Sequence, residues 1–348
     1  GSKVSDLLGT MQTEGFDAAF LGVGAHIAKR AYIPAGDAQK ISDAVGVLRG
    51  MEAAEKPLLG RRVVVYGGGN TAIDVARTAR RLGAEESIIV YRRTRDRMPA
   101  HEQELHEALE EGVRMKWLST VKEAGESSIT VEKMELDENG FPQPTGELET
   151  VEADSLVLAL GQDVDLSLLE AVEGLQIESG VVRVGADMMT GHPGVFAGGD
   201  MVPGERTVTV AIGHGKKAAR AIDAWLRVER LQAPPKHEVA TFERLNTWSF
   251  ADAPQTVRPS LDIIRRQSTF DEVTGGLDES NALFEARRCL SCGNCFECDN
   301  CYGVCPDNAV IKLGPGNRFR FNYDYCKGCG LCVAECPCGA ITVAPETI

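Results

Sequence analysis

The sequence predicts an α/β protein with two domains built on mainly parallel sheets, followed by a small α+β domain at the C-terminal end. Three observations lead to this fold class. An apolar strand at residues 63–66 runs into a glycine-rich turn and then a helix. Two further apolar strands, within "SLVLALG" and "GVFAGGD", also end at glycines. All eleven cysteines lie late in the chain, between Cys289 and Cys338.

Composition narrows the class of protein and its compartment. Of the 348 residues, 43% are hydrophobic and 25% are charged, which is typical of a water-soluble protein. The net charge of -14 disfavours nucleic acid or an anionic membrane as a partner and suits a basic protein surface. No apolar run approaches the roughly 20 residues of a membrane span, and the first residues do not resemble a signal peptide. An odd number of cysteines in one segment suits thiol ligands better than disulfides, so we expect a cytoplasmic protein.

The cysteines contain an internal repeat. Two runs read C-x2-C-x2-C-x3-C-P, the spacing of bacterial two-cluster ferredoxins. Their continuations, "CPDNAVI" and "CPCGAIT", are also alike. The first run is Cys295, Cys298, Cys301 and Cys305, and the second is Cys326, Cys329, Cys332 and Cys336.

This spacing predicts two [4Fe-4S] clusters. Three thiolates of one run surround one cube, and the fourth, beside proline, ligates the other cube. The predicted first site is therefore Cys295, Cys298, Cys301 and Cys336, and the predicted second site is Cys326, Cys329, Cys332 and Cys305. Gly328 and Gly330 would let backbone N–H groups approach the sulfurs. A pair of structural zinc sites is the alternative, although zinc sites rarely take the form of two triplets that each end in x3-C-P.

Three cysteines remain outside the two runs: Cys289, Cys292 and Cys338. A register that starts at Cys289 is conceivable, but only the start at Cys295 leaves three residues before the Cys-Pro pair. A third metal site made from the leftovers would lack one thiolate. We therefore expect spare thiols near the domain junction.

The glycine-rich turn has the form of a dinucleotide-binding motif. Gly67 to Ala72 read G-x-G-x-x-A between a strand and a helix. Gly67 would permit the tight turn, Gly69 would let a pyrophosphate approach the backbone, and Ala72 would let helix and strand pack closely. Asn70 and Thr71 begin the helix, whose N-terminus would face the phosphates.

The end of the next strand, "SIIVY", predicts which nucleotide is bound. An NAD site needs an acidic residue there to hold the ribose hydroxyls, but this chain has Arg92 and Arg93, with Arg95 and Arg97 behind them. Guanidinium groups suit a 2′-phosphate, so we expect NADP(H). A solvated basic edge is the alternative.

The segment from Thr190 to Asp200 reads T-x-x-x-x-V-F-A-x-G-D. It resembles the second flavin fingerprint of flavoproteins with two dinucleotide-binding domains, and the match is closest to the small (beta) subunit of glutamate synthase and its relatives. The segments "FDAAFLGVGAH", "YRRTRDRMPA" and "ALGQDVD", which contains Gly161, are similar to that family too. The resemblance implies that Gly199 and Asp200 contact FAD, with the aspartate bound to the ribityl chain. The alternative for "VFAGGD" is a buried strand and turn.

In that family the helix after the fingerprint approaches the flavin ring. Its counterpart here begins near Thr207, Val208 and Thr209. The resemblance covers about residues 15–228 for the flavoprotein part and 284–348 for the ferredoxin part.

One departure from the family concerns the start of the chain. A first glycine fingerprint, which grips the ADP part of FAD, precedes these motifs in the family, but no G-x-G-x-x-G lies upstream of residue 60. Gly1 and Ser2 resemble residues left by cloning. We therefore expect a fragment without the first half of the flavin domain, in which FAD has lost the site for its AMP moiety.

The expected fold is thus two dinucleotide-binding (Rossmann-like) domains, with the FAD one discontinuous and truncated, plus a bacterial-type ferredoxin domain. The domains would be a remnant of the FAD-binding domain at 1–59, an NADP-binding domain at 60–153, the C-terminal part of the FAD-binding domain at 154–228, a connector at 229–283 and a two-cluster ferredoxin domain at 284–348. The connector contains proline-bearing polar stretches and reads as an ordered strap along the surface.

Together these parts predict an electron-transfer oxidoreductase subunit. A flavin can take a hydride pair from NADPH and release single electrons, which clusters carry. The first 288 residues contain no cysteine and so cannot form a redox disulfide. We therefore expect electrons to leave the flavin through the clusters. The partner could be a glutamate synthase large subunit, a 2-oxoacid oxidoreductase, whose ferredoxin subunit the tail "DYCKGCGLCVAECPCGAI" resembles, or another reductase or ferredoxin-type acceptor. The direction of flow is open. The rival hypothesis is a non-enzymatic electron wire whose nucleotide folds serve as docking scaffold.

Overall fold

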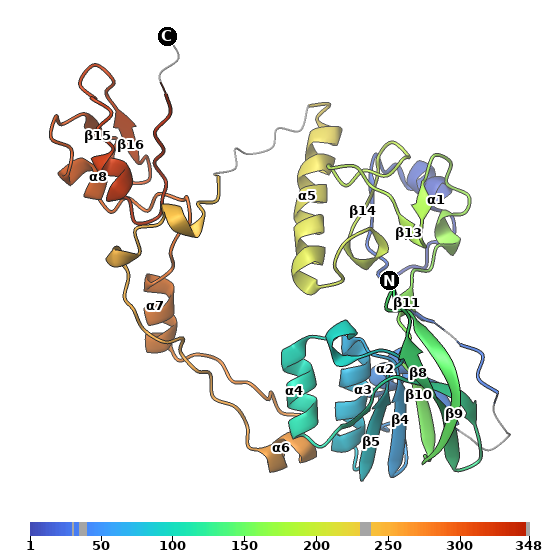
Figure 1. Ribbon diagram of the computed structural model, residues 1–348. Coiled ribbons are helices and arrows are strands. Elements are labelled where there is room, and N and C mark those ends of the chain that lie inside the picture. The colour runs from blue at the N-terminus through green and yellow to red at the C-terminus, as the bar shows by residue number, and fades with distance from the viewer. Residues whose placement is uncertain (30, 35–39, 230–237, 346–348) are drawn as a thin grey trace. The chain divides into compact units, whose positions relative to one another are not determined.

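The computed structural model describes residues 1–29, 31–34, 40–229 and 238–345 (Figure 1). The chain divides into two compact units. Unit 1 contains Gly1–Gln232 and Leu261–Asp271, and unit 2 contains Ala233–Ser260 and Glu272–Ile348.

A five-stranded parallel sheet lies at the centre of one half of unit 1. Its strands, in spatial order, are β3 (Lys40–Asp43), β10 (Ser155–Leu158), β4 (Arg62–Tyr66), β5 (Glu86–Val90) and β6 (Arg114–Lys116). Val63, Val64 and Val65 of β4 are all buried. Such unbroken apolar runs are expected where both faces of a parallel sheet are covered.

Helices cover one face of this sheet. They are α2 (Ala44–Gly50), α3 (Asn70–Arg81) and α4 (Glu102–Glu110). The apolar residues of α3, such as Ile73 and Ala76, recur at helical spacing and pack against Val63 and Val65. The helix therefore forms because one of its faces is buried against the sheet.

The other face is covered by strands. β7 (Ser119–Ala124), β8 (Ser128–Leu136) and β9 (Pro142–Glu152) form an antiparallel sheet beside it (Figure 1). Val64 and Val90 pack there against Ile129 and Val131 of β8. The motifs did not predict this antiparallel layer. The alternation of apolar with polar residues in β8, such as Ile129 and Val131, was the available signal.

Two of the expected domain boundaries do not follow the parallel sheet. β3 lies in the range expected to be a flavin-domain remnant, and β10 lies in the range 154–228, yet both strands belong to the sheet of β4. Sequence signals mark a strand and its turn, whereas the neighbours of a strand depend on contacts made far along the chain.

The other half of unit 1 has its own core. It contains α1 (Leu7–Glu14), β1 (Ala19–Leu21), β12 (Ile177–Glu178), β13 (Val181–Val182), β14 (Val195–Ala197) and α5 (Val208–Leu226). β1 and β14 pair in parallel, although they come from distant parts of the sequence. Phe196 and Met201 are completely buried in this core. Two short strands, β2 (Ile27–Ala28) and β11 (Gln162–Asp163), also pair in unit 1.

A short helix from the expected connector, α6 (Ile263–Ser268), packs on α3, and its Arg266 donates hydrogen bonds to α4. Asp262 caps it by accepting the N–H groups of Ile264 and Arg265. Arg266 donates to the buried carboxylate of Glu111 at 3.2 Å. This part of the connector is therefore ordered against unit 1, while residues 230–237 lie outside the described residues.

Unit 2 contains the cysteines. Its elements are α7 (Glu279–Arg287), α8 (Asn300–Gly303), β15 (Val310–Lys312), β16 (Phe319–Phe321) and α9 (Leu331–Ala334). The carboxylate of Glu285 on α7 accepts the N–H and hydroxyl of Thr256 at 2.9 and 2.5 Å. Arg288 donates to the Ala253 carbonyl at 2.5 Å. These bonds fasten the residues around 253–256 to α7.

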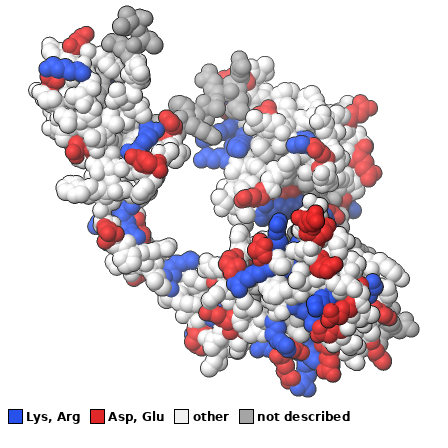
Figure 2. Space-filling view, viewed as in Figure 1, with Lys and Arg blue, Asp and Glu red and all other residues white. Residues whose placement is uncertain are grey.

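Charged side chains are largely paired over the sheet of unit 1. In the face that Figure 2 shows, blue and red side chains alternate there, in keeping with pairs such as Arg62 with Asp154 at 2.8 Å. The net charge of -14 is therefore not concentrated in one field on this face. Within the described part of the chain, no helix has the length and apolar character needed to cross a membrane.

Candidate nucleotide and iron–sulfur sites

The glycines between β4 and α3 meet three different constraints. Gly67 has a φ of +152°, and a Cβ there would lie 2.1 Å from the carbonyl oxygen of Ala159, just after β10. A Cβ on Gly68 would lie 2.4 Å from the ring of Tyr91. A Cβ on Gly69 would have no heavy atom of a described residue within 4 Å. The turn is therefore compressed at Gly67 and Gly68 and open at Gly69, where a ligand can approach the backbone.

The requirement for Gly68 was missed by the motif. It comes from Tyr91, which follows β5 and is fixed by a hydrogen bond from its hydroxyl to the Arg97 carbonyl at 2.7 Å. Its ring also packs edge-on against Trp117, with centroids 6.2 Å apart. A bulky aromatic residue at the end of the neighbouring strand was the signal for a small residue at position 68.

The first turn of α3 is suited to an anion. Its N-cap, Gly69, has no side chain to accept the first N–H groups, and the helix dipole adds positive potential there. Ala72 is fully buried, as close packing of helix and strand requires. Asn70 accepts the N–H of His101 at 2.9 Å and so holds the loop before α4. Thr71 accepts a long hydrogen bond from Gln162 at 3.4 Å.

The four arginines after β5 differ in their contacts. Arg95 pairs with Glu102, and Arg97 lies 3.6 Å from Asp96. In the described parts of the chain, no ion pair joins Arg92 or Arg93 to another residue. Arg92 is exposed. The Arg93 guanidinium lies 5.9 Å from the ring centroid of Phe141, between β8 and β9.

Arg93 also contains an orphaned polar atom. Its Nε is buried, and no described residue is its hydrogen-bond partner. A buried donor without a partner is costly, and a phosphate oxygen would satisfy it. The residues around Gly69 and Arg93 therefore fit a phosphorylated nucleotide.

The expected flavin-contacting turn lies between β1, β14 and α5. The Leu21 carbonyl at the end of β1 accepts the N–H of Gly198 at 3.0 Å. Gly199, with φ of +74°, donates its N–H to Nδ1 of His214 on α5 at 3.2 Å. Asp200 follows and is half-buried. The turn is thus fixed from two sides, and His214 is a contact that the fingerprint does not reveal.

Two further predicted residues connect to this half of unit 1. Gly161 has a φ of +102°, and its carbonyl accepts the N–H of Lys29 at 3.0 Å. Thr207 caps α5 by accepting the N–H of Val210 at 3.3 Å. Val208 and Thr209 follow on an exposed surface, and 77% of Val208 is accessible to solvent. The helix start predicted to approach the flavin ring is therefore open in this chain.

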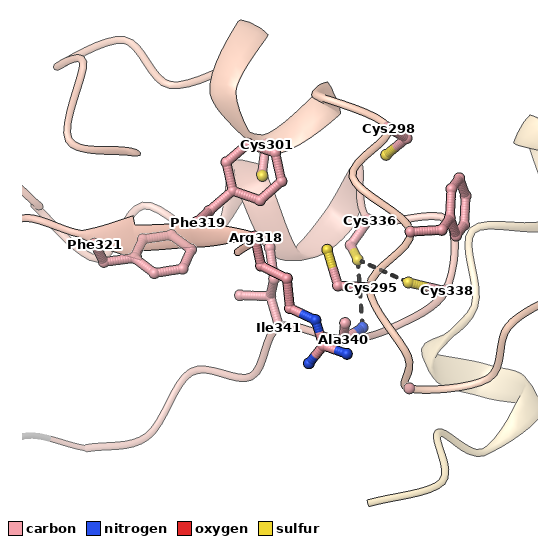
Figure 3. Close-up of a pocket in the computed structure, with 12 residues that line it drawn as sticks. Cys295, Cys298, Cys301, Arg318, Phe319, Phe321, Cys336, Cys338, Ala340 and Ile341 are labelled. Carbon is pink, nitrogen blue, oxygen red and sulfur yellow. Dashed lines mark hydrogen bonds between the residues drawn. The ribbon is translucent and has the colours of Figure 1, made fainter. Parts of the chain in front are cut away.

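The four predicted ligands of the first site line one pocket in unit 2 (Figure 3). Cys301 lies on α8, Cys295 and Cys298 lie on the loop before it, and Cys336 follows α9. Arg318 and the rings of Phe296, Phe319 and Phe321 complete much of the wall. A thiol that was not predicted as a ligand, Cys338, lines the same pocket.

The two halves of the cysteine repeat have matching backbones. Each run of cysteines has positive φ at the same three places. The pairs are Glu297 and Gly328 at 60° and 66°, Asp299 and Gly330 at 68° and 77°, and Asn308 and Gly339 at 53° and 63°. Because such φ values are strained for residues with side chains, the curl of the loop is imposed by the fold.

The repeat also indicates where the second predicted site lies. Cys332 lies on α9, Cys326 and Cys329 lie on the loop before it, and Cys305 follows α8. Asn300 of α8 donates to the Glu335 carbonyl after α9 at 3.2 Å, which ties the two halves together. In each half the sulfur of the fourth cysteine accepts an N–H four residues onward: Cys305 from Ala309 at 3.2 Å and Cys336 from Ala340 at 3.3 Å. Backbone N–H groups near thiolate sulfurs are typical of iron–sulfur sites.

The pKa values of two cysteine thiols, Cys301 and Cys305, are shifted in opposite directions. Burial and the neighbouring thiols Cys295 and Cys298 raise the pKa of Cys301 to about 11. Burial raises the pKa of Cys305, but the N–H groups of Asp307 and Ala309 lower it more, so its pKa is below the ordinary value. In the described residues, no three His, Cys, Asp or Glu side chains lie close enough together to hold a single metal ion. A cluster bound at the first site would displace the proton of Cys301, so its binding would be favoured by rising pH.

A parallel sheet with an open glycine turn at a helix N-terminus, joined to a two-fold cysteine repeat, defines a nucleotide-dependent oxidoreductase with an iron–sulfur domain. The chain belongs to the pyridine nucleotide-disulphide oxidoreductase family, whose model matches residues 2–215. A 4Fe-4S binding domain matches residues 319–342. These matches confirm the predicted fold class and support FAD, a nicotinamide nucleotide and [4Fe-4S] clusters as cofactors.

Curated relatives confirm the resemblance to the glutamate synthase small subunit. The chain is 34% identical over 303 residues to the NADP(+)-dependent formate dehydrogenase subunit beta of Moorella thermoacetica, which covers 80% of this chain and 42% of that protein. It is 32% identical over 241 residues to the glutamate synthase [NADPH] small chain of Escherichia coli (strain K12), covering 61% of this chain and 51% of that one. The chain thus spans about half the length of these relatives.

Among solved structures, a mutant of FprA from Mycobacterium tuberculosis shares the fold. The TM-score is 0.52 with 20% sequence identity, and the match covers 63% of this chain and 66% of that one.

Proposed function

We propose that this chain is the electron-transfer part of a larger oxidoreductase, in which electrons pass between NADPH and two [4Fe-4S] clusters through FAD, to or from a partner subunit. The observation that carries the proposal is that one chain combines the open glycine turn at α3 with a pocket lined by the four thiols of the first site. An electron carrier alone would not need the first feature.

When bound, FAD would take an electron pair from NADPH and pass single electrons to the clusters. The chain's own residues bind NADPH and orient it. The N–H groups at the start of α3 and the open backbone at Gly69 hold the pyrophosphate. Arg92 supplies a cation that pairs with no described residue, and Arg93 supplies a buried donor, for the 2′-phosphate.

On the flavin side, Gly199 and Asp200 lie at the carboxyl end of β14, and His214 fixes the turn that presents them. The carboxylate of Asp200 would accept hydrogen bonds from the ribityl hydroxyls. The start of α5, at Thr207 to Thr209, would face the flavin ring with the positive end of the helix dipole.

The partner is another subunit of an oxidoreductase. This proposal is supported by the names of the relatives, one of which is the beta subunit of a formate dehydrogenase and the other the small chain of a glutamate synthase. The net charge of -14 favours a partner with a basic docking surface. Eight of the eleven cysteines have a predicted ligand role, which favours a reducing compartment such as the cytoplasm.

A second candidate function is favoured by the exposed start of α5. Val208 and Ile212, one turn apart, are 77% and 67% exposed. If FAD does not bind at this open surface, the chain would act as an iron–sulfur electron wire whose nucleotide folds serve as docking scaffold.

Steady-state reduction of cytochrome c by NADPH distinguishes the two functions. We would compare the chain loaded with FAD and iron against the same chain loaded with FAD after iron removal. Reduction that requires both FAD and iron supports the proposed pathway. Reduction unaffected by iron removal would place the exit at the flavin, and no reduction by NADPH despite intact clusters would favour the electron wire.

A further inference from the structure

Five thiols, not four, line the first site. Cys338 is only 2% exposed and lies in the same pocket as Cys295, Cys298, Cys301 and Cys336. Figure 3 shows its sulfur turned toward that of Cys336, with the contact drawn as a dashed line. The two sulfurs are 3.8 Å apart. Neither the spacing of the repeat nor the family match gives Cys338 a role.

The separation of these two sulfurs has a chemical meaning. A tetrahedral metal with metal–sulfur bonds of about 2.3 Å places neighbouring thiolates about 3.8 Å from each other. Cys336 and Cys338 are therefore close enough for either sulfur to reach the same iron atom. Only the ordinary freedom of the two side chains is needed for one to replace the other.

The repeat shows which of the two is the ordinary ligand. Cys336 corresponds to Cys305, since both accept a backbone N–H four residues onward at 3.2–3.3 Å. The residue that corresponds to Cys338 is Asp307, two residues after Cys305. Its carboxylate pairs with Lys327 at 2.7 Å. The second site therefore has an ion pair where the first has an extra thiol.

The backbone around Cys338 is held in place. The Cys338 carbonyl accepts the N–H of Gly293 at 2.6 Å. The next residue, Gly339, has its carbonyl bound by Arg244 at 3.0 Å, and a Cβ there would lie 2.7 Å from the Arg244 carbonyl oxygen. Contacts on both sides thus fix the position from which the Cys338 thiol enters the pocket.

We propose that Cys338 is a reserve ligand of the first cluster. Were the bond between iron and the Cys336 sulfur lost, the Cys338 thiol would release its proton to solvent and its sulfur would bind the same iron, while the freed Cys336 thiolate would take up a proton. No electron is transferred, and the cluster keeps four thiolate ligands. The inference rests on the proposed function only in requiring a cluster at the first site.

The test counts iron in four alanine variants of the full chain, reconstituted anaerobically with iron and sulfide. Two [4Fe-4S] clusters give about eight iron atoms per chain in the parent. We expect Cys336→Ala and Cys338→Ala each to keep about eight, because either thiol suffices. The double variant should lose about one to four iron atoms, as should the matched control Cys305→Ala, which has no reserve thiol. The EPR spectrum of the reduced protein identifies which cluster has changed.

Two results would overturn the proposal: Cys336→Ala losing as much iron as Cys305→Ala, or Cys338→Ala alone losing iron. A parent chain that takes up no iron would instead contradict the proposed function. If Cys336→Ala fails to fold, the proposal can be tested by introducing the extra thiol at the corresponding position of the second site. Asp307→Cys in the Cys305→Ala background should restore about eight iron atoms, and failure to restore them would show that a thiol at this position cannot serve.

Discussion

At the residue scale, the glycine turn contains two glycines that close packing requires and a third that leaves room for a ligand. Gly67 and Gly68 must be glycine because a Cβ at either position would clash. The clash at Gly67 would be with Ala159 and that at Gly68 with Tyr91. None of the described residues requires a glycine at position 69, since a Cβ there would meet none of their atoms within 4 Å. There is room for a side chain at position 69. A ligand that approaches the backbone there would explain why the residue is glycine.

Alanine at each position should therefore act differently. We expect Gly69→Ala to cost less than about 1 kcal/mol of unfolding free energy but to weaken NADPH binding about tenfold or more, because the methyl group occupies the path of the pyrophosphate. Gly67→Ala should cost about 2 kcal/mol or more, because its Cβ meets a carbonyl oxygen. Thermal unfolding and calorimetric titration with NADPH measure the two effects. Unchanged NADPH affinity in Gly69→Ala would refute the assigned role.

The two arginines after β5 give a second test at this scale. We expect Arg92→Ala to weaken NADPH binding about tenfold, since a charge-assisted hydrogen bond to the 2′-phosphate is lost. NADH lacks that phosphate, so its affinity should change little. Arg95→Ala is the matched control, because Arg95 already pairs with Glu102. Equal losses for NADPH and NADH would mean that Arg92 does not read the phosphate.

At the element scale, a buried carboxylate joins three helices. Glu111, just after α4, accepts two hydrogen bonds from Arg77 of α3 at 2.8 and 2.6 Å. Arg266 of α6 donates to it at 3.2 Å, and Arg81 lies 3.4 Å away. Its side chain is 1% exposed. The connector helix is thus attached to unit 1 through one charge that has several partners.

Removing that charge should be costly. We expect Glu111→Gln to lower the free energy of unfolding by about 3 kcal/mol, because three arginines lose a buried anion. The exposed pair of Asp223 and Arg227 on α5 supplies the control, and Asp223→Asn should cost less than about 1 kcal/mol. Urea unfolding of the two variants gives the comparison. Similar costs in both would show that the buried network contributes no more than a surface pair.

The same network predicts a pH dependence. Burial raises the pKa of Glu111, but the ion pairs with Arg77 and Arg81 lower it more, so the pKa lies below its ordinary value of 4.5. A group with a lowered pKa contributes its full stability above its unfolded value and loses it as the pH falls through the folded value. The difference between parent and Glu111→Gln should therefore be constant above about pH 5 and shrink below about pH 4. A difference that grows on acidification would contradict this.

The elements that the sequence could predict are those whose signals lie within one continuous stretch. β4, the glycine turn and α3 follow one another directly, and so do the cysteines of each run. The antiparallel sheet β7–β9 and the attachment of α6 depend on distant partners instead. Glu111 and Arg266 are more than a hundred residues apart in the sequence, so no local spacing could predict their contact. Cys338 was recognised as a leftover thiol, but only the structure places it beside Cys336.

At the scale of the whole molecule, each unit contributes a different capability. Unit 1 has a surface suited to a nucleotide, and unit 2 has thiols arranged for clusters. Clusters cannot accept a hydride, so the two capabilities are useful together only if a flavin converts the hydride pair into single electrons. The family match over residues 2–215 and the 4Fe-4S match over residues 319–342 fit this combination.

We propose above all that electrons pass between NADPH and the clusters within this chain. An anaerobic titration of the iron-loaded, FAD-supplemented protein with NADPH, followed by its visible spectrum, tests it most directly. We predict that the flavin band bleaches and that the broad cluster absorbance falls with it. Cluster absorbance that dithionite bleaches but NADPH leaves untouched would contradict the claim.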